Sequence, residues 1–439
     1  MVAFSPILAA EIHSNAPVAL LVGIILVLVT VPIARSMSAR ARDPSLYRLL
    51  MAAVVAHLLF SSVNLWVVDH IYHGVTDYTR YIDQGATLAR RFDKFNFSTA
   101  GIHPTVVILG QGSVSISAGV VMAIVGVNKL ALFYVFSWLA FIATLGFYRA
   151  FCVTFPEGNH RRYALCVFFL PSLLFWTSGP AKETVMYLAL GMMSYGAARI
   201  LSHQRGGAVL LVIGTIIGIY VRPQELLLFM AAFVVAGLFR RRGVDRSFRG
   251  ARRLAVMGLQ AVLLLAAVSL SQELAKHAPV FNLNQLAKNN VGQASSLHYH
   301  PGPSGYPRDL YDVIFDPTPL NAHGSAQRLA AFENTVILLL FLTSFRRLRC
   351  LARTAFTRPY VLMCLMYCVA FPYAFAALNN LGLIDRERVL FLPFLLVLLS
   401  VPLTPRGQPP MYPWEASEKK RKRKSSQGRW GASPVPARR

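Results

Sequence analysis

Apolar runs of about 20 residues recur along this chain, and they constrain its fold more than any other feature. A helix of that length matches the roughly 30 Å hydrocarbon core of a lipid bilayer. Charged residues make up only 14% of the chain, whereas a soluble domain carries about 25%. The sequence therefore predicts an all-α integral membrane protein without a soluble catalytic domain.

We expect a polytopic domain over residues 1–403, followed by a disordered basic tail over 404–439. The apolar runs predict about 11 transmembrane helices. They lie near 17–34, 49–68, 130–150, 163–178, 184–201, 207–221, 224–239, 254–271, 329–345, 359–378 and 388–403.

The loops between these runs alternate in basic content, and this alternation predicts the topology. If the N-terminus is outside, 31 of the 44 Lys and Arg residues fall on the cytoplasmic side and 13 fall outside. Cytoplasmic loops of membrane proteins are enriched in Lys and Arg. We therefore predict a multi-pass plasma-membrane protein with an outer N-terminus and a cytoplasmic C-terminus.

The net charge of +25 raises the question of a nucleic-acid partner. The positive charge lies in short loops and in the tail, so we expect no nucleic acid as a partner. We expect the basic run at 419–424 to contact anionic lipid headgroups instead. The five cysteines lie in or beside apolar runs or in a cytoplasmic loop, so neither disulfides nor a zinc site are expected.

Two large outer loops are predicted. The first, 69–128, contains an amphipathic stretch over 78–95 that is typical of a helix lying along the membrane surface. It also contains an apolar segment, 104–126, whose crossing would invert every later loop. We therefore interpret 104–126 as interfacial or re-entrant, with Gly110 and Gly112 permitting a bend. The second loop, 272–328, is expected to form a partly ordered cap.

Four basic residues depart from the charge alternation, because they lie at the outer ends of apolar runs in very short loops. Pro180 and Pro223 favour helix starts beside two of them, and helix N-termini attract anions. Arg binds phosphate well, so the four together predict a phosphate site. The alternative is that long side chains simply extend toward the membrane interface without a ligand. These residues are Lys182, Arg222, Arg386 and Arg388.

Acidic residues are expected on the same face. Asp77 immediately precedes the amphipathic stretch and could act as a general base on a hydroxyl group. Its alternative role is that of a helix N-cap, which Asp favours. Glu333 lies within an apolar run and therefore needs a partner or a function. Further candidate supporting residues are Tyr81, Asp83, Glu183 and Glu225.

Several strings around these residues resemble blocks of bacterial polysaccharide-synthesis membrane proteins. They are PSLLFWTSGPAKE (171–183), YVRPQE (220–225), NLGLIDRERVLFLP (380–393) and PTPLNAHGSAQRLAAFEN (317–334). An Asp in the first outer loop, at the start of a surface helix, resembles the polytopic glycosyltransferases of the GT-C class. The similarity touches most of residues 60–400.

This resemblance implies a GT-C-like fold, an outward-facing active site and a polyprenyl-phosphate-linked sugar donor. It implies that Asp77 is catalytic and that the four basic residues contact phosphate. The chain departs from the family pattern because Asp77 is followed by Tyr78 rather than by a second acid. A divalent metal therefore stays an open question, and Asp83 or Asp69 could substitute for Asp77.

We thus expect a glycosyltransferase that moves a sugar to a cell-envelope glycan or glycolipid. One alternative is an O-antigen-type polysaccharide polymerase or ligase. Others are a transporter or flippase for a lipid-linked sugar and a non-catalytic scaffold. A transport path should carry polar residues near the membrane midplane, and few are found there.

Overall fold

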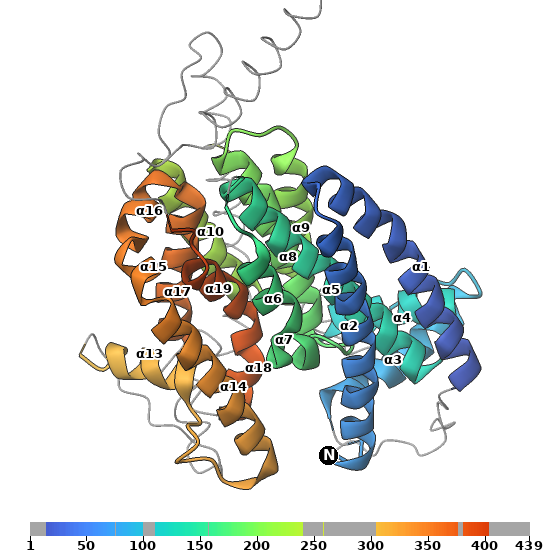
Figure 1. Ribbon diagram of the computed structural model, residues 1–439. Helices are drawn as coiled ribbons and strands as arrows, with labels where there is room; N and C mark the ends of the chain where they lie inside the picture. Colours follow the sequence, from blue (N-terminus) through green and yellow to red (C-terminus); the bar gives the residue numbers. More distant parts are fainter. Residues whose placement is uncertain are drawn as a thin grey trace, which may run out of the picture.

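The computed structural model describes residues 15–239 except 75, 100–109 and 157, and also residues 258, 304–375 and 381–403. Three predicted features lie outside the described residues: the span 254–271, most of the second outer loop and the tail 404–439. The described parts form helices and no β-strand (Figure 1). They are α1 (Ala16–Ala41), α2 (Pro44–His70), α3 (Asp77–Phe92), α4 (Gln111–Val125), α5 (Lys129–Thr154), α6 (Arg161–Phe169), α7 (Pro171–Trp176), α8 (Lys182–Leu201), α9 (Gly207–Val221), α10 (Pro223–Leu238), α13 (Tyr306–Phe315), α14 (Gly324–Thr343), α15 (Phe345–Arg349), α16 (Leu351–Thr357), α17 (Pro359–Phe375), α18 (Leu381–Glu387), the 3-10 turn η4 (Arg388–Leu390) and α19 (Leu392–Leu399).

Four of the described helices, α1, α2, α5 and α8, are long and apolar enough to cross a membrane. The apolar helices α4, α9, α10 and α17 are shorter, at 10–17 residues. The described part of the chain is therefore all-helical and has the long apolar helices of a membrane protein. The total of about 11 spans stays a prediction.

Two predicted spans are not single helices. The run 163–178 is divided into α6 and α7, because Leu170 takes an extended conformation before Pro171. The run 388–403 is divided into η4 and α19, with Pro393 in the first turn of α19. Proline lacks an N–H and clashes with the preceding helical turn, so an apolar run that contains it need not be one helix.

The centre of the bundle is formed by α5, α8 and α9, which pack closely through glycines (Figure 1). A Cβ atom added at Gly191 of α8 would lie 2.5 Å from the carbonyl oxygen of Ala143 in α5. A Cβ atom added at Gly196 would lie 2.6 Å from the carbonyl oxygen of Gly207 in α9. Small residues at these positions allow the helix backbones to approach each other, as is common in membrane helix pairs.

Several helix ends meet at one end of the bundle, which we call the site end. Here α2 finishes beside the start of α5, with Asp69 and Lys129 4.0 Å apart. The start of α8 and the turn between α9 and α10 also meet here, because Glu183 contacts Arg222. At the opposite end of the bundle Arg358 donates a 2.5 Å hydrogen bond to the Thr154 carbonyl.

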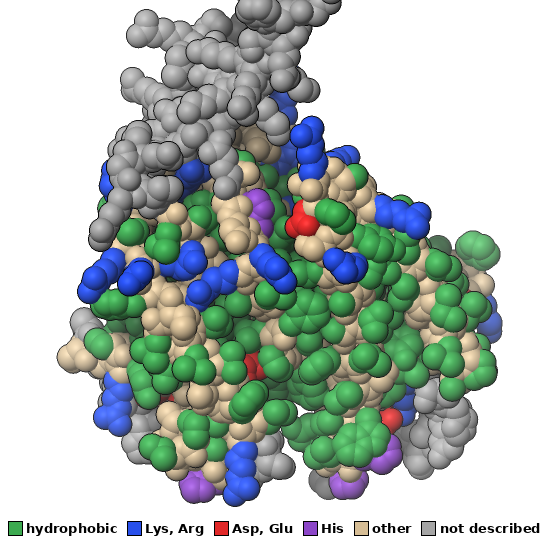
Figure 2. All heavy atoms as spheres, in the orientation of Figure 1, with side chains coloured by type: hydrophobic (Ala, Val, Ile, Leu, Met, Phe, Trp, Pro, Cys, Tyr) green, Lys and Arg blue, Asp and Glu red, His purple; other side chains and the backbone are tan. Residues whose placement is uncertain are grey.

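Most visible Lys and Arg side chains lie towards the opposite end, in the upper part of Figure 2, and a broad hydrophobic zone lies below them. This separation matches the charge alternation of the sequence.

The helices α3 and α4 pack side by side, and α4 also contacts α5, α8 and α9 (Figure 1). Gly85 of α3 lies so close to Ala118 of α4 that an added Cβ would come within 2.8 Å of it. Both ends of α4 lie at the site end: the Gly110 N–H donates to Tyr220 at the end of α9, and Gly126 is two residues before the N-cap of α5. Of the two glycines predicted to permit a bend, Gly110 is the N-cap of α4 and has a φ of 71°, whereas Gly112 lies within α4.

Candidate functional site

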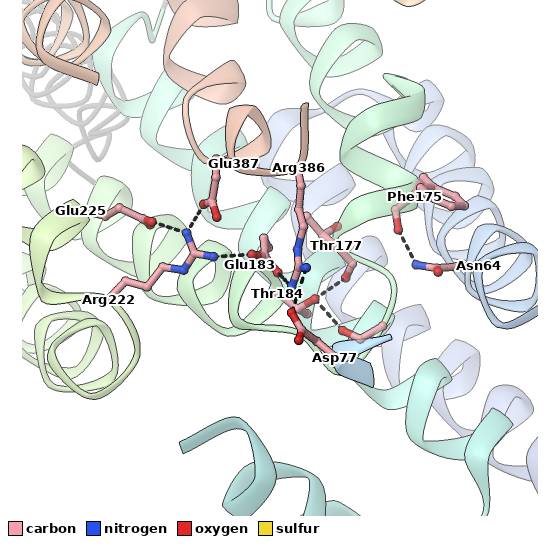
Figure 3. Close-up of polar contacts among 11 residues, drawn as sticks. Asn64, Asp77, Phe175, Thr177, Glu183, Thr184, Arg222, Glu225, Arg386 and Glu387 are labelled. Carbon is pink, nitrogen blue, oxygen red and sulfur yellow. Dashed lines mark hydrogen bonds and ion pairs between the residues drawn. The ribbon is translucent and has the colours of Figure 1, made fainter. Parts of the chain in front are cut away.

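The turn that leads into α8 is fixed by polar side chains of α2. Asn64 donates hydrogen bonds of 2.8 Å to the Phe175 carbonyl and 3.0 Å to the Ser178 hydroxyl. Thr184 donates back to the carbonyl of Gly179, at 2.6 Å. These contacts satisfy polar groups that an apolar environment would otherwise leave unpaired. They hold Glu183 at the first turn of α8 (Figure 3), next to Lys182, the first residue of that helix.

Glu183 lies between two arginines, and Figure 3 shows them on either side of its carboxylate. One oxygen is 2.8 Å from Arg386 of α18, and the other contacts Arg222. The Glu183 side chain is fully buried. A buried carboxylate requires such partners, because an unpaired charge in a low-dielectric interior is strongly unfavourable.

Arg222 is surrounded by acids. Besides Glu183, its guanidinium contacts Glu387 and lies 2.5 Å from Glu225. Burial acts to lower the pKa of Arg222, but the three carboxylates outweigh burial and hold this pKa well above its ordinary value. Only 6% of Arg222 is exposed. Its hydrogen-bonding capacity is directed at protein groups rather than at a ligand.

Asp77 is the exposed end of the same network. Its carboxylate is 3.3 Å from Arg386, and 46% of its side chain is accessible. The residue occupies the first turn of α3, where Thr76 is the N-cap. Asp77 is therefore not the N-cap that the alternative interpretation required. It is the outermost member of a chain of alternating charges that runs through Arg386, Glu183 and Arg222 (Figure 3).

Lys182 differs from the arginines beside it. It is half-buried at the N-terminus of α8, near Glu183 and Glu387. Within the described ranges of the chain it forms no ion pair within 4.0 Å. A cation at a helix N-terminus, with backbone N–H groups beside it, is a favourable place for an anion.

Arg388 belongs to a different cluster. It is 3.2 Å from Asp385 and donates hydrogen bonds to the Ile314 carbonyl, at 3.2 Å, and to Asn334, at 2.6 Å. Glu333 lies beside this cluster and accepts a 2.7 Å hydrogen bond from the Ser172 N–H at the start of α7. Arg388 is only 1% exposed. This second cluster ties α13, α14, α7 and η4 together.

The structure thus brings together most of the predicted site residues, but not all. Asp77, Lys182, Glu183, Arg222, Glu225 and Arg386 share one network. Tyr81 lies one turn after Asp77 and interacts electrostatically with it. Arg388 and Glu333 form the second cluster instead. Asp83 and Asp69, the suggested substitutes for Asp77, are associated with Lys129.

Two members of the site were missed from the sequence. Glu387 lies between two arginines in the string DRER, and that alternation of charge was the available signal. Asn64 lies inside an apolar run, and a polar side chain in such a run usually has a partner.

Metal coordination can be assessed for the described part of the chain. There, no group of three or more His, Cys, Asp or Glu residues is arranged to hold a metal ion. The question of a divalent metal, which the sequence left open, therefore gains no ligand set from these residues.

Comparison with known proteins gives no relative to guide the assignment. No family model, no curated protein and no solved structure matches this chain. The chemistry of the site must therefore be argued from its own residues.

Proposed function

We propose that this protein is an integral membrane glycosyltransferase. It would transfer a sugar from a polyprenyl-phosphate donor to a cell-envelope glycan or glycolipid, at the extracytoplasmic face of the plasma membrane. The observation that carries the proposal is the position of Asp77. Its carboxylate is accessible and held by one arginine at 3.3 Å, whereas the acids behind it are buried.

An accessible carboxylate beside a guanidinium suits the role of general base. The arginine fixes the orientation of the carboxylate, while the free oxygen can receive a proton. In the proposed step, Asp77 takes the proton of the acceptor hydroxyl, and the acceptor oxygen forms a bond to the anomeric carbon. The bond from this carbon to the phosphate oxygen breaks, and its electron pair leaves with the lipid phosphate.

The leaving phosphate needs a cation that is not already neutralised. Lys182 fits this role because it forms no ion pair with the described residues and lies at the start of α8. A charged hydrogen bond of this kind contributes about 1.5–3 kcal/mol. We assign Arg222 and Arg388 to structural roles, since both are buried among protein partners. Arg386 is assigned to positioning Asp77.

The outward orientation is supported by the charge separation between the two ends of the bundle. The Arg-rich end would face the cytoplasm, so Asp77 would face the outer compartment, where lipid-phosphate sugars can reach it within the membrane plane. Cysteine substituted at Asp77 in intact cells tests this orientation. It should react with a membrane-impermeant thiol reagent, and protection from that reagent would contradict the orientation.

The function is tested in proteoliposomes with a panel of polyprenyl-phosphate hexoses and pentoses, guided by mass spectrometry of glycolipids that copurify with the protein. We expect Asp77→Asn to lower the rate of transfer by ~10²–10⁴-fold. The matched control is Asp69→Asn, an acid at the same end of the bundle that pairs with Lys129. If the folded Asp77→Asn protein kept the parental rate of transfer, Asp77 would not be the general base. If the intact donor crosses the proteoliposome bilayer and no sugar is transferred, the protein is a transporter instead.

A further inference from the structure

The charges around Arg222 do not balance. Four carboxylates, on Asp77, Glu183, Glu225 and Glu387, form ion pairs with only two cations, Arg222 and Arg386, and Lys182 forms no ion pair with the described residues. Asp77 is accessible, so the imbalance lies among the three other acids, which share the two arginines. Of the four carboxylates, Glu183 and Glu225 are fully buried and Glu387 is 6% exposed. An uncompensated negative charge in such a place is strongly unfavourable, and a bound cation or proton removes it.

The carboxylates differ in the number of cationic side chains that they contact. Glu183 contacts two arginines. Glu387 contacts Arg222 and also interacts electrostatically with Arg386 and Lys182. Glu225 contacts Arg222 alone, and Arg222 is shared with the other two acids. Glu225 is therefore the carboxylate with the least compensation.

Atoms without partners lie at the same place. The Oε2 atom of Glu225 is buried and accepts no hydrogen bond from the described residues. The hydroxyl of Tyr367 in α17 is also buried without a described partner, and Tyr367 interacts electrostatically with Glu225 and Glu387. A carboxylate oxygen that finds no donor is the atom on which a proton would be held.

We infer that the cluster around Arg222 binds one proton, which is carried by the carboxyl group of Glu225. This proton makes the buried group of three carboxylates and two arginines neutral. The groups that face Glu225 are Arg222 in the turn before α10, Glu387 of α18, Glu183 of α8 and Tyr367 of α17. Burial raises the pKa of Glu387, which agrees with an environment that disfavours a further ionised carboxyl. The inference does not depend on sugar transfer.

Infrared difference spectroscopy of the full-length protein in lipid nanodiscs tests this inference. The parent should show a carbonyl stretch of a protonated carboxyl group near neutral pH, and Glu225→Gln should lose it. Asp69→Asn, an acid outside the cluster that pairs with Lys129, should retain that band. Glu387→Gln should also lose it, because the remaining two carboxylates and two arginines are already neutral without the proton. Retention of the band in Glu225→Gln would overturn the assignment.

Thermal unfolding gives an independent test, because Gln has the shape of a protonated Glu and carries no charge. Glu225→Gln should therefore melt at the parental temperature, whereas Glu183→Gln, which deprives two arginines of their shared acid, should melt at a lower one. If Glu225→Gln fails to fold or melts as early as Glu183→Gln, the carboxyl is ionised and the inference is wrong. Stabilisation of the parent by Na⁺, absent in Glu225→Gln, would identify a bound cation instead of a proton.

Discussion

The guanidinium of Arg386 lies 3.3 Å from the carboxylate of Asp77, although 309 positions separate the two residues in the sequence. Its other terminal nitrogen is 2.8 Å from buried Glu183. The contact with Glu183 anchors the arginine, and the contact with Asp77 orients an accessible acid. This relationship distinguishes a positioning role for Arg386 from the phosphate-binding role that the sequence suggested.

Arg386→Gln separates these two roles. We expect kcat to fall about 10- to 100-fold, the equivalent of one charged hydrogen bond, with little change in KM for the donor. Arg386→Lys should recover part of the rate, because it restores the charge without the two-pronged geometry. Steady-state kinetics with a titrated donor measure both constants. A raised KM with unchanged kcat would mean that Arg386 contacts the phosphate.

Lys182 and Arg222 should respond in opposite ways to removal of their charge. Lys182→Gln is expected to weaken donor binding about 10- to 100-fold and to leave the melting temperature unchanged, because Lys182 has no ion pair with the described residues. Arg222→Gln leaves three buried carboxylates without their shared cation and should cost about 3–5 kcal/mol of stability. Thermal unfolding in detergent, together with donor titration, checks the pair. Equal destabilisation of the two variants would show that Lys182 is structural.

Gly191 should tolerate no side chain. An added Cβ would lie 2.5 Å from the Ala143 carbonyl oxygen, which is backbone and cannot turn aside. We expect Gly191→Ala to lower stability by about 1–3 kcal/mol, as overpacked cores do. Gly218→Ala is the control, since its nearest neighbour is a side-chain methyl of Leu226 at 3.5 Å. Both are glycine-to-alanine changes within apolar helices, so similar melting temperatures would contradict the close approach of α5 and α8.

Asp385 should make stability depend on pH. Burial raises its pKa from 3.8 to about 6, although Arg388 acts in the opposite direction. The folded protein therefore takes up this proton at a higher pH than the unfolded chain does. The group's contribution to the free energy of unfolding should increase as the pH falls from about 6 towards 3.8, by at most about 1.4 kcal/mol per pH unit.

The measurement is a series of thermal melts across this pH window for the parent and for Asp385→Asn. Asn cannot take up the proton, so the variant should lack this part of the pH dependence. Identical slopes for the two proteins would show that Asp385 does not titrate there.

Much of the architecture could be predicted from the apolar runs. The long helices α1, α2, α5 and α8 follow from length and hydrophobicity, which act locally. The breaks at Pro171 and before Pro393 were missed, because an apolar run is measured by its hydropathy and not by its backbone conformation. Helix length alone does not establish how many segments cross the membrane, so the number of spans stays a prediction.

The site was only partly predictable for a different reason. Position at a helix end placed Lys182, Arg222 and Arg386 at one end of the bundle. It could not say which way each side chain points. Arg386 and Arg388 are two residues apart, and the helical turn between them directs one to Asp77 and the other to Asp385. Such pairing depends on tertiary contacts that no local pattern encodes.

The late position of Arg386 and Glu387 in the sequence also affects the order in which the charged network forms during synthesis. Translation produces Asp77, Glu183 and Glu225 long before the arginine and glutamate at 386 and 387. Until that late segment arrives, Asp77 lacks its arginine and Arg222 lacks one of its three acids. The groups of this network that are synthesised first therefore lack these partners until α18 is made, and a nascent chain that ends before α18 leaves Asp77 and Glu183 without Arg386.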